Sequence, residues 1–179
     1  MELAAQIVSI VGMIFNLISF QQKEHKRAVV CQFFSSATFC VSYFMLGATV
    51  GGILNIIGVI RALVFIFKDK TKADHLLWLV AFSTLFVLSY PLAFLAFGKE
   101  ISPKNLIVEA LPVLAMIVNT ASLRMGSTRA IRRLGLIASP LWLTYNIFCL
   151  SIGAIASEIL NLASIIIGII RLDVKKKNE

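Results

Sequence analysis

The sequence predicts an all-α membrane protein with seven transmembrane helices. Of its 179 residues, 59% are hydrophobic and only 15% are charged, which is far from the mixture of an ordinary soluble domain. The ionisable residues gather in short clusters, and the apolar runs between these clusters reach about 18 residues or more, the length that crosses a bilayer core as a helix. Because hydrocarbon cannot hydrogen-bond a bare backbone, each run is expected to be helical.

Seven apolar runs follow one another along the chain. We expect helices at residues 3–20, 28–46, 50–67, 76–98, 106–123, 134–151 and 154–172. The first run lacks the basic start of a cleavable signal peptide, since its basic residues come afterwards in QQKEHKR, and we interpret it as a retained helix. The third, fourth, fifth and seventh runs end at charge clusters, which are residues 68–74, 99–104, 124–133 and 171–179.

The net charge of +8 has a topological explanation. With seven helices, the connections after the first, third and fifth helices share one side of the membrane with the C-terminus. Fourteen of the 17 Lys and Arg residues lie on that side: Lys23, Lys26, Arg27, Lys68, Lys70, Lys72, Arg124, Arg129, Arg132, Arg133, Arg171, Lys175, Lys176 and Lys177. This asymmetry predicts an outside N-terminus and a cytoplasmic C-terminus. The basic rim is expected to attract anionic lipid, and nucleic acid is not an expected partner.

The chain carries a faint internal duplication. MIFNLIS at 13–19 aligns with MIVNTAS at 116–122, and ILN at 53–55 meets ILN at 159–161 after a three-residue slip. The same register pairs three further positions: Ser36 with Ser139, Phe39 with Trp142 and Tyr43 with Asn146. We therefore predict two parallel three-helix repeats, residues 1–70 and 105–179. A connecting helix within 71–104 joins them, and Pro91 is expected to bend it.

Small and polar groups lie along one face of four expected helices, an arrangement that lipid does not favour. The candidate solute-binding residues are Asn16, Asn55, Asn119, Tyr145, Asn146, Glu158 and Asn161. Two interpretations stay open for the asparagines. Either small residues allow close helix approach and the amides bond across helices, or the amides surround a polar pathway and present donors and acceptors to an uncharged or zwitterionic solute.

Three ionisable residues lie within the expected helices. Glu109 and Glu158 each lie a few residues inside an outer helix end. There the carboxylate either reaches headgroup water or faces the bundle interior. Arg61 is expected to snorkel to the inner interface, with contact to the substrate and pairing with Asp69 as the alternatives. The candidate hinges are Pro112, Pro140, Gly58 and Gly168, and a tolerated kink is the alternative for the prolines.

Enzyme signatures are missing from the sequence. It has no GxSxG, HExxH, P-loop or glycine-rich dinucleotide motif, so neither catalysis nor a metal or other cofactor is expected. The cysteines Cys31, Cys40 and Cys149 have no CxxC spacing, and we interpret them as small hydrophobic residues in helix packing.

Four blocks of sequence point to a family. They are LGATVGGILNIIGVIR at 46–61, VEALPVLAMIVNTASL at 108–123, WLTYN at 142–146 and IGAIASE at 152–158. Together they resemble the YgjV family of bacterial inner-membrane proteins, which is similar in repeat plan to the SWEET, semiSWEET, PnuC and PQ-loop transporters. The resemblance implies two parallel bundles with a solute route between them, and it places Asn55 and Asn161 at the central amide positions. The chain departs from the sugar carriers in having FQQK, not a Pro-Gln pair, after its first helix.

The leading hypothesis is a carrier in the bacterial inner membrane for an unknown small polar solute, such as a sugar, nucleoside or vitamin, that alternates access between the two halves. The alternative is a non-transporting receptor, assembly factor or partner-binding module with the same fold. A third hypothesis is lipid handling, with the basic rim and the aromatic sixth helix holding a headgroup. Each of these is compatible with a homo-oligomer.

Overall fold

The computed structural model describes residues 2–95, 98–148 and 152–174, and all regular structure in these ranges is helical. The long helices are α1 (Glu2–Gln21), α2 (His25–Met45), α3 (Thr49–Ile66), α5 (Leu76–Leu95), α6 (Pro103–Arg124), α7 (Thr128–Phe148) and α8 (Ile152–Gly168). A single turn, α4 (Lys68–Thr71), follows α3, and a π-helix, η1 (Ile169–Val174), extends α8. The expected all-α class is confirmed. Cys149 and Lys175–Lys177 lie outside the described residues.

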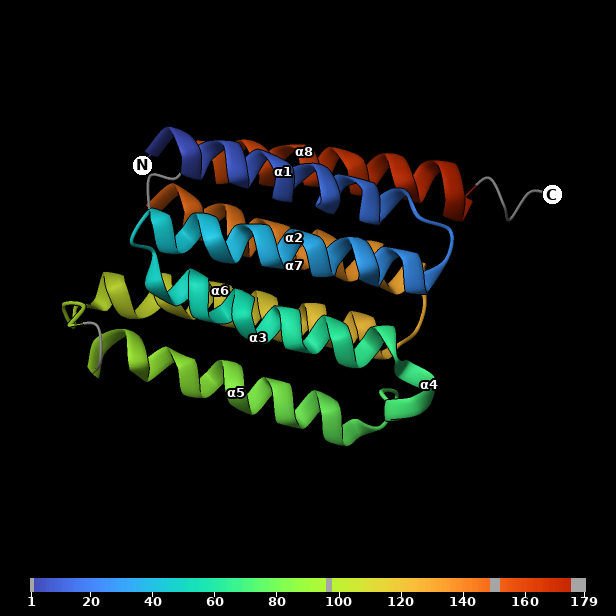
Figure 1. Ribbon diagram of the computed structural model, residues 1–179, viewed down its shortest axis with the longest axis horizontal. Coiled ribbons are helices and arrows are strands. Elements are labelled where there is room, and N and C mark those ends of the chain that lie inside the picture. The colour runs from blue at the N-terminus through green and yellow to red at the C-terminus, as the bar shows by residue number, and fades with distance from the viewer. Residues whose placement is uncertain (1, 96–97, 149–151, 175–179) are drawn as a thin grey trace.

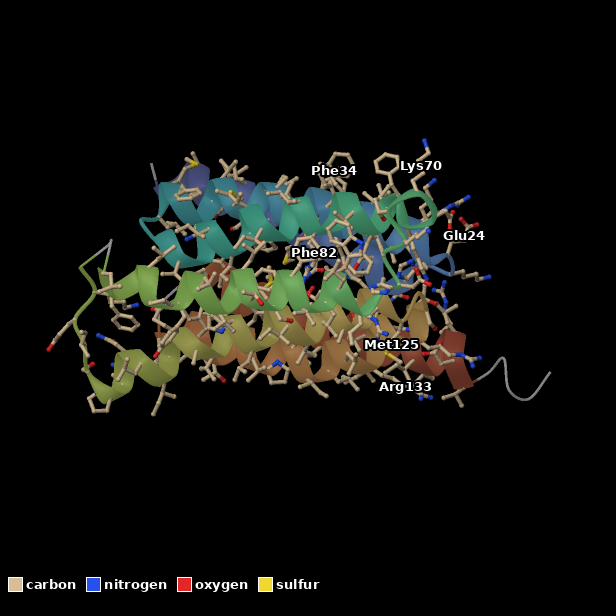
Figure 2. All side chains as sticks on the ribbon, turned by 90° about the horizontal axis from the view of Figure 1, so that it is seen from below. Glu24, Phe34, Lys70, Phe82, Met125 and Arg133 are labelled. Atoms are coloured by element: carbon tan, nitrogen blue, oxygen red, sulfur yellow. The ribbon has the colours of Figure 1, made fainter. Side chains whose placement is uncertain are left out.

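The long helices form two layers of three, with α5 along one edge. Figure 1 shows α1, α2 and α3 in front of α8, α7 and α6, and Figure 2 shows the same two layers from below. Helix α2 packs between α1 and α3, and α7 packs between α6 and α8. The layers meet where α1 contacts α8 and where α3 contacts α6, while α5 packs against α3 and α6.

The first and last described residues, Glu2 and Val174, lie at opposite ends of the bundle, where α1 begins and η1 ends (Figure 1). Successive long helices run in alternating directions, so that α1, α3, α6 and α8 run one way and α2, α5 and α7 run back. The connections after α1, α3 and α6 therefore share the end at which η1 lies. Figure 2 shows Glu24, Lys70 and Arg133 toward this end.

The surface of the bundle is apolar and much of its interior is polar. On α1 the exposed side chains include Leu3, Ile7, Ile10, Ile14 and Ile18, whereas Ser9 and Ser19 are buried. Buried groups elsewhere include Asn55, Arg61, Glu109, Asn146 and Asn161. A soluble protein shows the reverse distribution. The distribution observed here suits lipid around the bundle, because only the interior offers partners for polar groups.

Four helices in the described part of the chain are long and apolar enough to cross a membrane: Leu3–Gln21, His25–Met45, Pro103–Arg124 and Gly153–Val174. Two shorter apolar helices, Val50–Ile66 and Leu76–Leu92, accompany them. Helix α7 is less apolar, because Arg129, Arg132 and Arg133 lie in its first two turns.

The helix boundaries differ from the expected ones where helices continue past their apolar run. Helix α7 begins at Thr128 and not near residue 134, because its arginines extend the helix beyond the apolar run. Helix α6 begins three residues early, because Ser102 caps it by accepting a hydrogen bond from the Asn105 amide at 3.2 Å and Pro103 suits the first turn. Helix α5 continues through Pro91.

Candidate functional site

A cavity of about 80 Å³ lies between the two layers. Six helices contribute to its lining, and α5 does not contribute among the described residues. A volume of this size has room for several water molecules or a small polar group, since one water needs roughly 10–15 Å³ of cavity volume. The cavity is therefore on a smaller scale than a drug-sized pocket of roughly 300–1,000 Å³.

Five of the seven candidate solute-binding residues line this cavity. They are Asn16 on α1, Asn55 on α3, Asn119 on α6, Asn146 on α7 and Glu158 on α8. Residues that lie far apart in the sequence therefore meet at one place. The other two candidates, Tyr145 and Asn161, are buried but are not part of the lining.

Asn55 and Asn161 differ in how their amides are satisfied. Asn55 Nδ2 donates to the carbonyl oxygen of Gly51, one turn earlier in its own helix, at 2.8 Å. Asn161 is 1% exposed, and neither its Nδ2 nor its Oδ1 meets full hydrogen-bond geometry with a described residue. Its side chain lies beside the Glu158 carboxylate, which lines the cavity, so the amide is not isolated from polar groups.

Aromatic side chains form a cluster beside Asn146. The Tyr43 and Trp142 rings stack with their centroids 6.3 Å apart, and Tyr145 meets Trp142 edge-on at 5.9 Å. Phe39 lies 6.1 Å from Tyr43, and the Tyr43 hydroxyl donates to Asn146 Oδ1 at 3.3 Å. The expected aromatic region of the sixth helix is thus an internal contact between α2 and α7, with rings on the cavity wall.

Arg61 lines the cavity as a buried cation. Its side chain is 3% exposed, and Nη1 donates to the Met116 carbonyl oxygen at 3.1 Å and to Thr120 Oγ1 at 3.0 Å. The guanidinium carbon lies 5.7 Å from the centre of the Phe86 ring. The expected snorkelling and the pairing with Asp69 are both wrong, because Arg61 turns toward α6 and not toward the membrane edge.

Glu109 is fully buried, at 0% exposure, and pairs with Lys99 from the segment before α6. Its second oxygen, Oε2, has no partner among the described residues. Of the two interpretations of this carboxylate, the structure supports a side chain facing the interior and not one reaching headgroup water. Glu109 does not line the cavity.

The four candidate hinges occupy different environments. Pro112 is buried in α6, whereas Pro140 is exposed on α7. A Cβ atom on Gly58 would lie 3.0 Å from Met116 Cε and 3.3 Å from Ser36 Oγ, both on the cavity wall. A Cβ atom on Gly168 would lie 2.9 Å from the Phe20 carbonyl oxygen, so this glycine marks a close approach of α8 to α1.

Several residues that line the cavity were not among the candidates predicted from the sequence. Gln32, Ser35 and Ser36 line the cavity from α2. Their helical spacing with Phe39 and Tyr43 was the available signal, since all five lie on one face of a helix. The internal duplication did not reveal this face, because its register pairs Gln32 with Gly135 and Ser35 with Ala138, neither of which is polar.

Comparison with known proteins gives one finding. A family model described as "Bacterial inner membrane protein" matches residues 3–176. Neither a curated protein nor a solved structure matches the chain.

Proposed function

Since the chain belongs to the YgjV family of bacterial inner-membrane proteins and is a multi-pass protein of that membrane, we propose that it carries a small polar solute through the central cavity. The proposed mechanism is alternating access, in which the layer of α1, α2 and α3 and the layer of α6, α7 and α8 move against each other. The solute is carried without chemical change, so the protein is not proposed to be an enzyme.

The observation that supports this proposal most strongly is the pairing of residues around the cavity. The internal duplication aligns Asn16 with Asn119 and Ser36 with Ser139, and all four line the cavity. It also aligns Tyr43 with Asn146, whose side chains bond to each other across the layers. We therefore interpret the two layers as 3+3 repeats and α5 as the connecting helix. A site at the interface of two repeats is the usual place for a carrier's solute.

The state of the amides favours a carrier over a closed module. In a non-transporting core, the asparagines would bond to one another and leave no cavity. Here Asn55 bonds to its own helix, Asn161 lies beside the Glu158 carboxylate, and a cavity remains. The Asn55 amide lines that cavity and retains hydrogen-bonding capacity for a solute.

A cysteine-accessibility experiment tests the mechanism without knowledge of the solute. In a background with Cys31, Cys40 and Cys149 replaced by alanine, single variants Asn119→Cys and Asn146→Cys are treated with a membrane-impermeant thiol reagent from each side of sealed vesicles. Alternating access predicts that each cysteine reacts from both sides. A variant with cysteine at lipid-facing Ile60 is the control and should not react. Protection of both cavity cysteines from both sides would contradict a carrier and favour a non-transporting module.

Uptake by purified protein in vesicles tests the named amides. A panel of sugars, nucleosides, vitamins and amino acids is first screened for thermal stabilisation, and any stabilising compound is then assayed for uptake. The double variant Asn55→Leu with Asn161→Leu should lower uptake at least about tenfold, the effect of one or two lost hydrogen bonds. Thr84→Leu, an exposed polar-to-apolar change on α5, is the matched control. Unchanged uptake by the double variant would remove both amides from the site.

A further inference from the structure

One basic and one acidic side chain line the cavity. Arg61 on α3 and Glu158 on α8 both contribute to its lining. Among the described residues, neither of them forms an ion pair. This differs from the bundle's other buried charges, since Glu109 pairs with Lys99 and Arg132 pairs with Asp173.

A buried guanidinium without a carboxylate partner needs an explanation. Arg61 uses Nη1 on two neutral oxygens, and its Nε has no partner among the described residues. Neutral acceptors compensate only part of the cost of moving a cation out of water. In membrane-spanning helices, ionisable groups that face the interior commonly mark the path of a solute or ion.

We propose that the solute is a small zwitterion, whose carboxylate binds the Arg61 guanidinium and whose ammonium group binds the Glu158 carboxylate. This inference rests on the proposed function and names the class of its solute. A simple anion would meet the Glu158 carboxylate in the same cavity, and a simple cation would meet Arg61. A zwitterion compensates both charges, and the amides of Asn16, Asn55 and Asn119 lie in the same cavity for its neutral polar groups.

The size of the cavity limits the solute. Arg61 on α3 and Glu158 on α8 both line a cavity of about 80 Å³. A solute that meets both charges there is expected to be small, and the number of bonds between its two charges is the variable that the binding series tests.

Binding of a matched set of compounds to the full chain in nanodiscs tests the inference. The probes are alanine, β-alanine, 4-aminobutyrate and 6-aminohexanoate, which separate the same two charges by increasing distances. For each one, the corresponding carboxylate without the amine and the corresponding amino amide without the carboxylate are measured as well. Affinity is obtained from the rise in thermal unfolding temperature with ligand concentration.

We expect at least one of the four zwitterions to bind, and each of its singly charged analogues to bind roughly 10- to 100-fold more weakly, the range for a hydrogen bond to a charged group. Arg61→Gln should weaken zwitterion binding at least about tenfold and affect the amino amide much less. Glu158→Gln should weaken binding of the zwitterion and affect binding of the carboxylate analogue much less. Arg133→Gln, which removes an exposed charge from α7, is the control.

Two results would overturn the inference: no stabilisation by any of the four zwitterions, or equal affinity for a zwitterion and its singly charged analogues. If Arg61→Gln does not fold, the analogue series measured on the wild-type protein and on Glu158→Gln still tests the inference. The inference and the proposed function can fail separately. Uptake of a neutral solute without zwitterion binding overturns only the inference, whereas zwitterion binding without uptake overturns only transport.

Discussion

At the scale of single residues, the interior of this protein is organised by polar groups that lipid would not accept. The buried charges differ in how they are compensated. Glu109 forms an ion pair with Lys99, and Arg132 forms one with Asp173. Arg61 donates only to neutral oxygens and lies over the face of the Phe86 ring. The two ion pairs need no ligand, because each buried charge is compensated by an opposite charge within the chain. The arrangement around Arg61 is the reason that we assign Arg61 to the solute.

The Glu109–Lys99 pair gives a prediction on stability. Lys99→Met should lower the free energy of unfolding by about 1–2 kcal/mol, because it leaves a fully buried carboxylate without a counterion; the effect is moderated because the Lys99 side chain is 34% exposed. Glu109→Gln should restore part of this loss in the double variant. Thermal or denaturant unfolding of the four proteins in one detergent measures the cycle. Additive effects of the two changes would show that the two side chains do not interact.

At the scale of elements, the helices meet through a few specific polar contacts near one end of the bundle. Arg132 on α7 is 2% exposed and donates through Nε to Asp173 Oδ2 on η1 at 3.0 Å. Its Nη1 also donates to the carbonyl oxygens of Phe20 and Gln22 at 3.3 Å, at the end of α1. One guanidinium therefore holds three segments together. On α1, Gln21 adds a contact to α8, because its Nε2 donates to the Ser164 carbonyl oxygen at 2.7 Å.

Removal of this guanidinium should be costly. We expect Arg132→Gln to lower the free energy of unfolding by about 3–5 kcal/mol, since it leaves Asp173 buried without its main partner. The neighbouring Arg133 is exposed, and Arg133→Gln should change stability by no more than about 0.5 kcal/mol. Unfolding of both variants under the same conditions provides the comparison. Equal effects at the two positions would show that the contacts of Arg132 do not hold this end of the bundle.

The approach of α8 to α1 gives a second prediction at this scale. Gly168→Ala should lower the free energy of unfolding by about 1–3 kcal/mol, because the new Cβ would press on the Phe20 carbonyl oxygen, a backbone atom that cannot swing aside. Gly153→Ala in the same helix is the matched control. There the Cβ would meet the end of the flexible Gln6 side chain, so a small effect or a gain from better helix propensity is expected. If both substitutions prove harmless, the helices are not in close contact at Gly168.

At the scale of the whole molecule, α1 begins and η1 ends at opposite ends of the bundle (Figure 1). We propose that the N-terminus is outside and the C-terminus is cytoplasmic, because fourteen of 17 Lys and Arg residues belong to the end shared by the C-terminus. We also propose that the same end attracts anionic lipid headgroups.

This orientation predicts a labelling pattern in intact cells. In the cysteine-free background, Lys104→Cys lies in the first turn of α6 and should react with a membrane-impermeant thiol reagent added outside. Lys70→Cys lies in α4, at the other end, and should react only after the cells are permeabilised. Both side chains are exposed in a single helical turn, so each position controls for the reactivity of the other. The reverse pattern would invert the proposed orientation.

The all-α membrane class, the succession of apolar helices and the positions of most boundaries follow from the sequence alone. They depend on the length of apolar runs and on the clustering of charges, which are properties of contiguous residues. Five of the seven candidate residues line the cavity. The internal duplication had indicated Asn16, Asn55, Asn119 and Asn146, whereas Glu158 was indicated as an ionisable residue within an apolar run.

Only the packing of helices against one another decided which polar groups meet. Arg61 was expected at the membrane edge, yet its partner Met116 lies 55 residues away on α6. Gln32 gave no signal through the duplication, and Asp173 became a buried partner of Arg132 because η1 folds against α7. The side of a helix that faces a neighbour depends on contacts between distant segments, and periodicity within one segment shows that a polar face exists but not what it meets.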